Sequence, residues 1–251
     1  MLVDIILACV LRGDVKPLPK IEKEPVSSRI ELTEDELAFH KLSRDFLQQG
    51  RNYLKENKLE EAIECVEEAL EYAPRTKYCL GQAHNNLGAF HNHYAKMLRF
   101  VIEDTEKEIT KHKRNRKRRS VKKGRKEIRA MKQYLGFQVY MAGKEYDKAI
   151  ELWDDNEVFY ENKAKWCKFR EDTSWVLEFS KKALDLKPND PHYVFLYGVA
   201  CYESRKYQDA LIYVAKSCKL DEGYHDRAAI LMKKIHHDMK MDAKKFSVLN
   251  N

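Results

Sequence analysis

A 34-residue unit occurs twice in succession over residues 157–224. When 157–190 is aligned with 191–224, similar residues coincide along the whole unit. The coinciding pairs are Ala164 with Gly198, Cys167 with Cys201, Leu177 with Leu211, Phe179 with Tyr213, Lys182 with Lys216, Ala183 with Ser217 and Leu186 with Leu220. A fixed period of this length is typical of a helical hairpin repeated along a solenoid. The recurring small residues fit this interpretation, because two helices approach closely only where a side chain is small.

The ends of the predicted helices carry matching signals. Pro188 ends the second helix of the first copy. Asp190 is then the N-cap of the next helix, and Pro191 occupies its first position. At the other end of the chain, Thr33 and Glu36 form a capping box that begins a helix. These signals predict an all-α chain.

The spacing of small and apolar residues resembles the tetratricopeptide repeat family, and a third copy at 43–76 carries the resemblance best. Its matching residues are Phe46, Gly50, Tyr53, Leu59, Ala62, Val66, Ala69 and Pro74. The resemblance implies an all-α solenoid of helical hairpins. It also implies a non-catalytic adaptor or scaffold that binds a protein or peptide in a groove formed by the first helix of each hairpin.

The expected organisation follows from this resemblance. Residues 1–30 form an apolar N-terminal segment and a Pro-containing linker, 31–241 form the helical domain, and 242–251 form a tail. Within the domain we expect repeats at 43–76, 77–128, 129–156, 157–190 and 191–224, followed by a capping helix at 224–241. The repeat at 77–128 is degenerate and contains a basic insertion at 111–126.

The segment 76–111 departs from the repeat, because neither Gly nor Pro breaks it where the turn should be, near Asn92. Its apolar residues alternate three and four positions apart, as in a coiled coil. They are Leu80, Ala83, Leu87, Phe90, Tyr94, Met97 and Val101. This pattern predicts one helix of about 30 residues that forms, with a returning helix, an arm carrying the basic segment at its tip. Residues 136–149 resemble a further repeat, with an irregular turn at Gly143.

Charge is concentrated in one place. The formal net charge is +7, yet 111–126 alone holds 11 Lys and Arg and no acidic residue. Without it, 36 basic and 40 acidic residues remain, so the rest of the chain is mildly acidic. The basic residues singled out are Lys113, Arg114, Arg116, Lys117, Arg118, Arg119, Lys122, Lys123, Arg125 and Lys126. Such density fits a nuclear-import signal, a patch for RNA, DNA or another acidic partner, or a solvated loop.

The first 12 residues are largely apolar but too few to span a bilayer as a helix. Asp4 stands where a secretory signal would have a basic residue, so we expect this segment to pack on the protein or on a partner. The six cysteines form no CxxC pair and are expected to be reduced core thiols. This usage predicts a cytoplasmic protein, with the nucleus as the alternative raised by the basic segment.

No residue pattern indicates catalysis. The chain has no Gly-rich phosphate loop, HExxH motif or nucleophile elbow, so we expect no enzyme activity, cofactor or metal. His84, His91 and His93 form the one histidine cluster. His84 and His91 can share a helix face, but we expect all three to be surface or groove residues.

The resemblance also implies which residues line the groove. They are Arg44, Arg51, Lys55, Tyr134, Phe137, Asn162, Lys165, His192, Phe195 and Tyr202. Aromatic residues among basic ones suit an extended or helical peptide of some acidic character. The alternative is that several of these aromatic side chains belong to the core.

Overall fold

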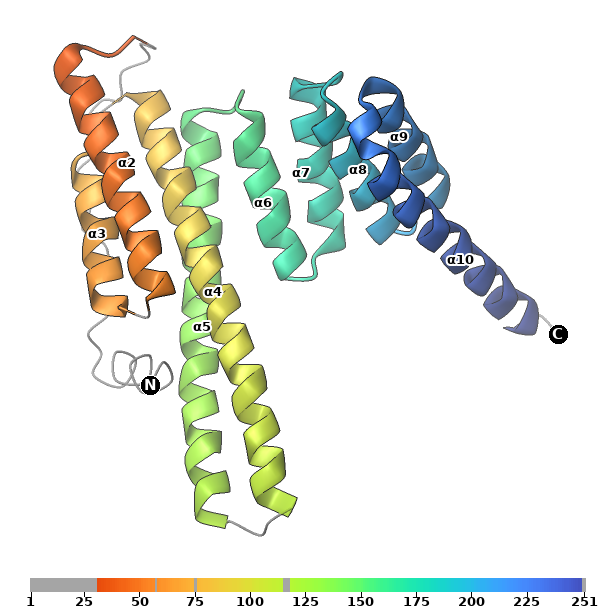
Figure 1. Ribbon diagram of the computed structural model, residues 1–251, viewed down its shortest axis with the longest axis horizontal. Helices are drawn as coiled ribbons and strands as arrows, with labels where there is room; N and C mark the ends of the chain where they lie inside the picture. The colour runs from red at the N-terminus through yellow and green to blue at the C-terminus, as the bar shows by residue number, and fades with distance from the viewer. Residues whose placement is uncertain (1–30, 57, 75, 115–117, 250–251) are drawn as a thin grey trace. The chain divides into compact units, whose positions relative to one another are not determined.

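The computed structural model describes residues 31–56, 58–74, 76–114 and 118–249. These residues form helices connected by short turns, with no strand among them, so the predicted all-α class is confirmed (Figure 1). The chain divides into two compact units, residues 1–154 and 155–251, which are described separately. The predictions for residues 1–30 lie outside the described residues, and the single domain expected over 31–241 stays a prediction.

The described residues of unit 1 form four helices: α2 (Glu34–Lys55), α3 (Leu59–Glu71), α4 (Lys77–Arg114) and α5 (Arg118–Leu152). The predicted capping box begins α2. The Thr33 backbone N–H donates to Glu36 Oε2 at 3.0 Å, and the Glu36 N–H donates to Thr33 Oγ1 at 3.3 Å. These two bonds satisfy N–H groups that have no partner inside the helix.

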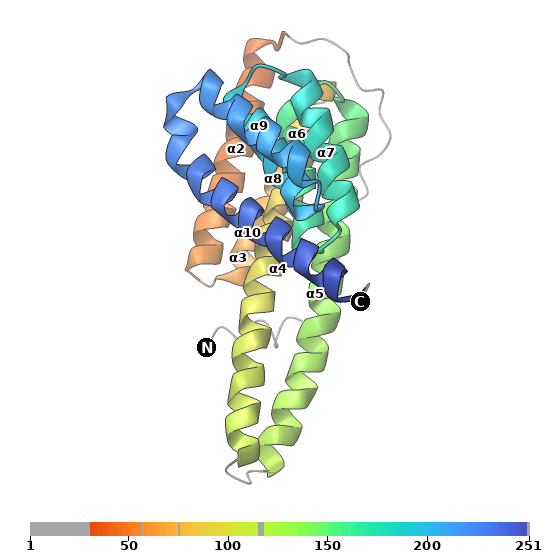
Figure 2. The ribbon, with the colours of Figure 1, turned by 90° about the vertical axis from the view of Figure 1, so that its right-hand side faces the viewer.

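The long helices α4 and α5 lie side by side and antiparallel in both ribbon views (Figures 1 and 2). Their shared core includes Leu87, Leu98, Met131 and Tyr134. The long helix predicted from the heptad pattern is therefore present, and it is longer than expected, with 38 residues. The parts of α4 and α5 toward residues 114 and 118 extend beyond the rest of the unit, and we call them the arm (Figure 2).

The turn expected at Gly143 is wrong, because α5 continues unbroken through this residue. Gly143 is buried within the helix instead of sitting in a turn. Ala142, Tyr146 and Ala149 follow the spacing of a second helix and are at most 1% exposed. The second half of α5 therefore pairs with the first half of α4 in one hairpin, and the arm replaces the turn between them. The repeat expected at 129–156 does not form a hairpin of its own.

A close contact locks this hairpin. A Cβ atom added at Gly88 of α4 would lie 2.8 Å from the ring of Tyr146 on α5. No side chain fits at that distance, so Gly88 allows the two helices to pack around the tyrosine ring. By contrast, Gly136 has no atom within 4 Å of such a Cβ. Gly136 is therefore not needed for the packing of α5 within the unit.

Unit 2 contains α6 (Glu157–Phe169), α7 (Thr173–Leu186), α8 (Pro191–Glu203), α9 (Tyr207–Leu220), the 3₁₀ turn η1 (Glu222–Tyr224) and α10 (His225–Leu249). Asp190 caps α8 as predicted, because its Oδ1 accepts from the His192 N–H at 2.8 Å. Pro191 is the first residue of that helix. The segment 224–241, expected as a capping helix, lies almost entirely within α10, which continues beyond it.

The second helix of each hairpin buries residues at the same spacing. The buried sets are Val176, Ser180 and Ala183 on α7 and Ala210, Val214 and Ser217 on α9. In the second hairpin, Gly198 packs against Val214, whose Cγ2 would lie 2.9 Å from an added Cβ. The 34-residue period of the sequence is thus also seen in which residues are buried in the two hairpins.

The described cysteines are all free thiols, in agreement with the sequence prediction. Cys65, Cys79, Cys167 and Cys201 are buried and Cys218 is partly buried. Within the ranges that the structure describes, no helix is both long enough and apolar enough to cross a membrane.

Candidate functional site

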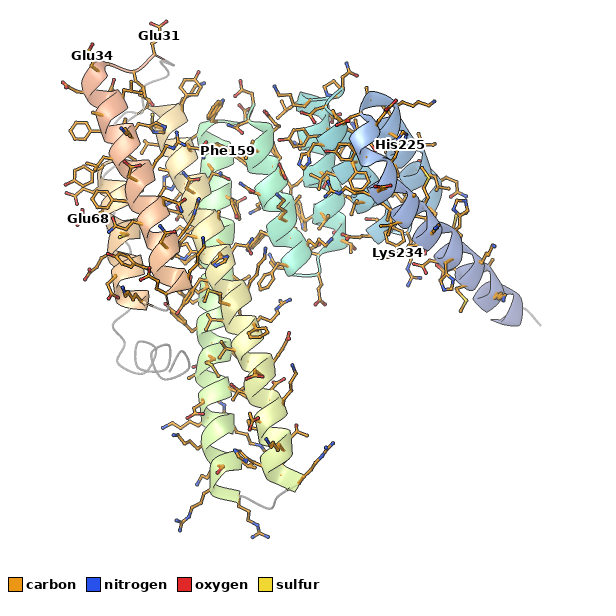
Figure 3. The ribbon with its side chains drawn as sticks, viewed as in Figure 1. Glu31, Glu34, Glu68, Phe159, His225 and Lys234 are labelled. Carbon is orange, nitrogen blue, oxygen red and sulfur yellow. The ribbon has the colours of Figure 1, made fainter. Side chains whose placement is uncertain are left out.

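A groove of 1130 Å³ lies on unit 1, between α2 and the beginning of α4. Its lining residues are Glu34, Leu37, Ala38, His40, Lys41, Arg44, Asp45, Leu47, Gln48, Arg51, Gln82 and Asn86. Glu34, labelled in Figure 3, marks the first turn of α2 at one end of the groove. The groove therefore uses the first helix of each of two successive hairpins, as the resemblance implies.

The charges of the groove are unevenly distributed along α2. Glu34 lies in its first turn, whereas Arg51 and Lys55 lie near its end. Opposite this end, burial lowers the pKa of His93, and the neighbouring charges of Lys96, Lys55 and Arg51 lower it further. The pKa of His40 is also lowered, by burial and by Arg44. Both shifts have the sign that a positive local potential produces.

Polar uncharged side chains also line the groove. The amide nitrogen of Gln82 donates to Asn86 Oδ1 at 3.2 Å, and both residues are partly exposed on α4. Gln48 faces the groove from α2 and pairs with Asn52 at 3.2 Å. Amide side chains both donate and accept hydrogen bonds, so this surface can bind the backbone of an extended peptide.

The structure separates the predicted groove residues of unit 1 into two sets. Arg44 and Arg51 line the groove, and Lys55 is exposed one helical turn after Arg51. Tyr134 is only 6% exposed and belongs to the core between α4 and α5, so its assignment to the groove is wrong. Phe137 is 38% exposed but lies on α5, the second helix of its hairpin. The error follows from the misread turn at Gly143.

In unit 2, two predicted basic groove residues already share an acidic partner. Lys165 Nζ lies 2.5 Å and His192 Nε2 3.0 Å from Glu161 Oε1. Burial alone would raise the pKa of Glu161, but its hydrogen bonds to Lys165 and His192 lower it overall. Lys165 and His192 are therefore less available to an acidic ligand than Arg44 and Arg51.

The remaining predicted residues of unit 2 also make internal contacts. Phe195 packs on Tyr224 with ring centroids 5.3 Å apart, and the Arg227 guanidinium lies 5.5 Å from the Phe195 ring. The Tyr202 hydroxyl donates to Asp238 Oδ2 at 2.7 Å. Asn162 is partly exposed on α6. All of these residues belong to unit 2, whereas the groove described above belongs to unit 1.

Sequence reasoning missed a second cavity, of 510 Å³, in unit 2. Its wall joins Tyr202 and Tyr207 to α10, where Asp242 accepts from the Tyr207 hydroxyl at 2.8 Å. The hydrogen bond to Asp238 raises the pKa of Tyr202 to about 12, and burial adds to this shift. Asp238 and Asp242 lie one turn apart on α10, a spacing that could have indicated their shared role. These bonds hold α10 on the last hairpin.

Two of the three clustered histidines are buried, so the surface position expected for them is wrong. His84 Nδ1 lies 2.5 Å from Glu145 Oε2, and His91 Nδ1 lies 2.7 Å from Gln138 Oε1. Burial lowers the pKa of His91. Both pairs join α4 to α5, which indicates a structural role. His93 is exposed, as expected.

The basic segment is helical on both sides of the undescribed residues 115–117, so within the described residues it is not a loop. Figure 3 shows its side chains projecting from both helices at the tip of the arm. Lys111 and Lys123 pair with Glu108 and Glu127 on their own helices. Among the described residues, the structure shows no acidic partner for the others, which are Lys113, Arg114, Arg118, Arg119, Lys122, Arg125 and Lys126. Arg116 and Lys117 lie outside the described residues.

The described residues form an all-α protein built from helical hairpins, with a groove between α2 and α4. Residues 47–91, from α2 through α3 into α4, match the tetratricopeptide repeat family. The match covers most of the part of the chain where the sequence resembles this family best, at 43–76.

Several solved structures are similar to the chain. MamA (residue 41 to the end) from Desulfovibrio magneticus RS-1 has a TM-score of 0.46 and 16% identity, over 83% of this chain and 92% of that chain. The tetratricopeptide repeat protein TTC0263 of Thermus thermophilus has a TM-score of 0.36 and 13% identity, over 74% and 97%. The TPR2AB domain of yeast Sti1 in complex with pHSP90 has a TM-score of 0.34 and 16% identity, over 79% and 70%. A comparison with curated proteins finds no match.

Proposed function

We propose that this chain is a non-catalytic adaptor whose unit 1 groove binds an extended peptide with acidic side chains. The observation that carries the proposal is the position of Arg44 and Arg51 in a groove formed by α2 and α4. Tetratricopeptide repeat proteins are generally non-catalytic scaffolds, and the family match begins in α2 and ends in α4.

The charge gradient along α2 favours one direction for the peptide. The acidic part of the peptide lies near Arg51 and Lys55, and a basic or neutral part lies near Glu34. Gln82 and Asn86 bind the peptide backbone. Attraction between opposite charges favours this direction of the peptide in the groove, and repulsion between like charges opposes the reverse direction.

A selection from a random peptide library tests this proposal. Immobilised wild-type protein should enrich peptides with clustered Asp and Glu, whereas the Arg44→Glu/Arg51→Glu variant should lose this preference. The Arg118→Glu/Arg119→Glu variant changes the net charge equally but lies at the tip of the arm, far along the chain from the groove. If the control loses the preference as fully as the groove variant, the binding site is not the groove.

The alternative function, binding of RNA or DNA by the basic segment, has no support from the comparisons. It remains an untested prediction, as does the import of the protein into the nucleus. The unpaired cations at the tip are compatible with any acidic partner, since attraction to phosphate requires only charge.

A further inference from the structure

One face of α5 is exposed along most of the helix. Its residues recur three or four positions apart, so they form a single stripe. They are Lys122, Lys126, Arg129, Gln133, Gly136, Phe137, Tyr140, Lys144, Asp147 and Glu151. The stripe exists because α5 continues through Gly143. With a turn there, its two halves would lie on different helices.

The centre of the stripe combines a glycine with two exposed aromatic side chains, one of which, Phe137, also stacks on Tyr134 at 6.1 Å between ring centroids. Gly136 is a poor helix former in the middle of a helix, yet an added Cβ would meet no atom within 4 Å. Beside it, Phe137 is 38% and Tyr140 is 64% exposed. A residue without a side chain next to two exposed aromatic rings is suited to the close approach of a second helix.

The two ends of the stripe have opposite charge. Lys122, Lys126 and Arg129 lie toward the tip of the arm, and none of them has an ion-pair partner among the described residues. Asp147 and Glu151 lie at the other end and are exposed. A stripe that is basic at one end and acidic at the other is complementary to a copy of itself running in the opposite direction.

We propose that two copies of this chain associate through α5, with the two helices antiparallel. The register that places Lys122 opposite Glu151 of the second copy also places Lys126 opposite Asp147. In the same register Phe137 faces Gly136, and the reciprocal contact forms across the two-fold axis. Both copies thus contribute the same residues of α5 to the interface, as a dimer with two-fold symmetry requires.

Two symmetry-related contacts oppose this register, because Arg129 of each copy faces Lys144 of the other. Both residues are exposed in each copy, so salt screens their repulsion. Four opposite-charge contacts, two from each copy, and the two aromatic contacts at the centre favour association. A different partner protein would need a helix with the same order of basic and acidic residues. A second copy of this chain already carries that order on α5.

Light scattering coupled to size-exclusion chromatography tests the proposal with the full chain. Wild-type protein should approach a mass twice the 29.7 kDa of one chain as its concentration rises. Gly136→Leu should remain a monomer, because the added side chain blocks the Phe137 contact, while its Cβ meets no atom within 4 Å in its own chain. Thr110→Leu, which adds the same side chain to an exposed position of α4, should dimerise as the wild type does.

An exchange of charges tests the register. Lys126→Glu should weaken dimerisation by about tenfold, and combining it with Asp147→Lys should restore it. The proposal is overturned if wild-type protein stays monomeric throughout, as it would if this face bound only another protein or a nucleic acid. It is also overturned if Gly136→Leu dimerises normally or the exchanged pair fails to recover. None of these results depends on the groove of unit 1.

Discussion

Glu171 and Arg205 lie 34 residues apart and have the same unusual backbone conformation, with φ angles of 63° and 58°. Each follows the first helix of a hairpin in unit 2. The bond that closes the turn is also repeated: the Asp172 N–H donates to Cys167 O at 3.0 Å and the Lys206 N–H to Cys201 O at 2.9 Å. The repeat period is therefore present in the backbone as well as in the side chains.

Replacing Glu171 with Gly should stabilise unit 2. The left-handed region is unfavourable for a residue with a Cβ but is readily adopted by Gly, which favours the substitution. The larger loss of backbone entropy when Gly folds offsets part of this gain. The expected net gain is about 0.5–1 kcal/mol in the free energy of unfolding. Urea unfolding monitored by the fluorescence of Trp166 and Trp175, both in unit 2, measures it. Glu171→Val should instead destabilise the unit, and equal stabilities for the two variants would contradict the backbone assignment.

Gly198→Leu should destabilise unit 2 by about 1–3 kcal/mol, because overpacking forces neighbouring atoms to move. The closest atoms would be Val214 Cγ2 at 2.9 Å and the Val214 backbone nitrogen at 3.2 Å, and the backbone cannot move aside cheaply. Ala229→Leu, at an exposed position of α10, is the matched control and should change stability by less than about 0.5 kcal/mol. A wild-type melting curve for Gly198→Leu would mean that α8 and α9 pack differently.

The sequence predicted the parts of this structure that depend on local spacing. The period, the caps at Thr33 and Asp190 and the long helix α4 all follow from residues close together in the chain. The turn predicted at Gly143 is wrong because the sequence alone does not distinguish a Gly buried in a helix from a Gly in a turn. Whether Gly packs or bends the chain depends on neighbours that are distant in sequence.

The burial of the histidines also depends on residues that are distant in sequence. His84 and His91 lie seven residues apart, a spacing that places both on one face of α4. Their partners, Glu145 and Gln138, are 61 and 47 residues away in the chain. The spacing was visible in the sequence, but only the return of α5 shows that this face is buried. The groove was predicted more accurately where it depends on α2 alone, through Arg44 and Arg51.

Acidification should destabilise unit 1 through His91. Burial lowers the pKa of His91 in the folded protein below its usual 6.5, so the unfolded chain binds this proton more readily. The stabilising contribution is complete above about pH 6.5 and is lost as the pH falls from there toward the folded pKa. Thermal melting between pH 7.5 and 5.5, roughly one unit on either side of this value, should show a falling Tm.

The control for this prediction is His91→Gln, which removes the titrating group. The variant should have a shallower dependence of Tm on pH than the wild type, whatever its stability at neutral pH. His40 and His93 have pKa values lowered by burial and by nearby cations, so part of the dependence should remain. Identical slopes for wild type and variant would show that His91 does not titrate as proposed.

The affinity for an acidic peptide tests the central proposal most directly. Fluorescence anisotropy should be measured with one labelled Asp- and Glu-containing peptide from the library selection, against wild type, Arg44→Glu/Arg51→Glu and Arg118→Glu/Arg119→Glu. The groove variant should bind at least about tenfold more weakly, a loss of about 1.4 kcal/mol, while the arm variant stays within about twofold of wild type. Equal affinities for wild type and the groove variant, or a loss confined to the arm variant, would contradict the proposal that the groove between α2 and α4 binds the partner.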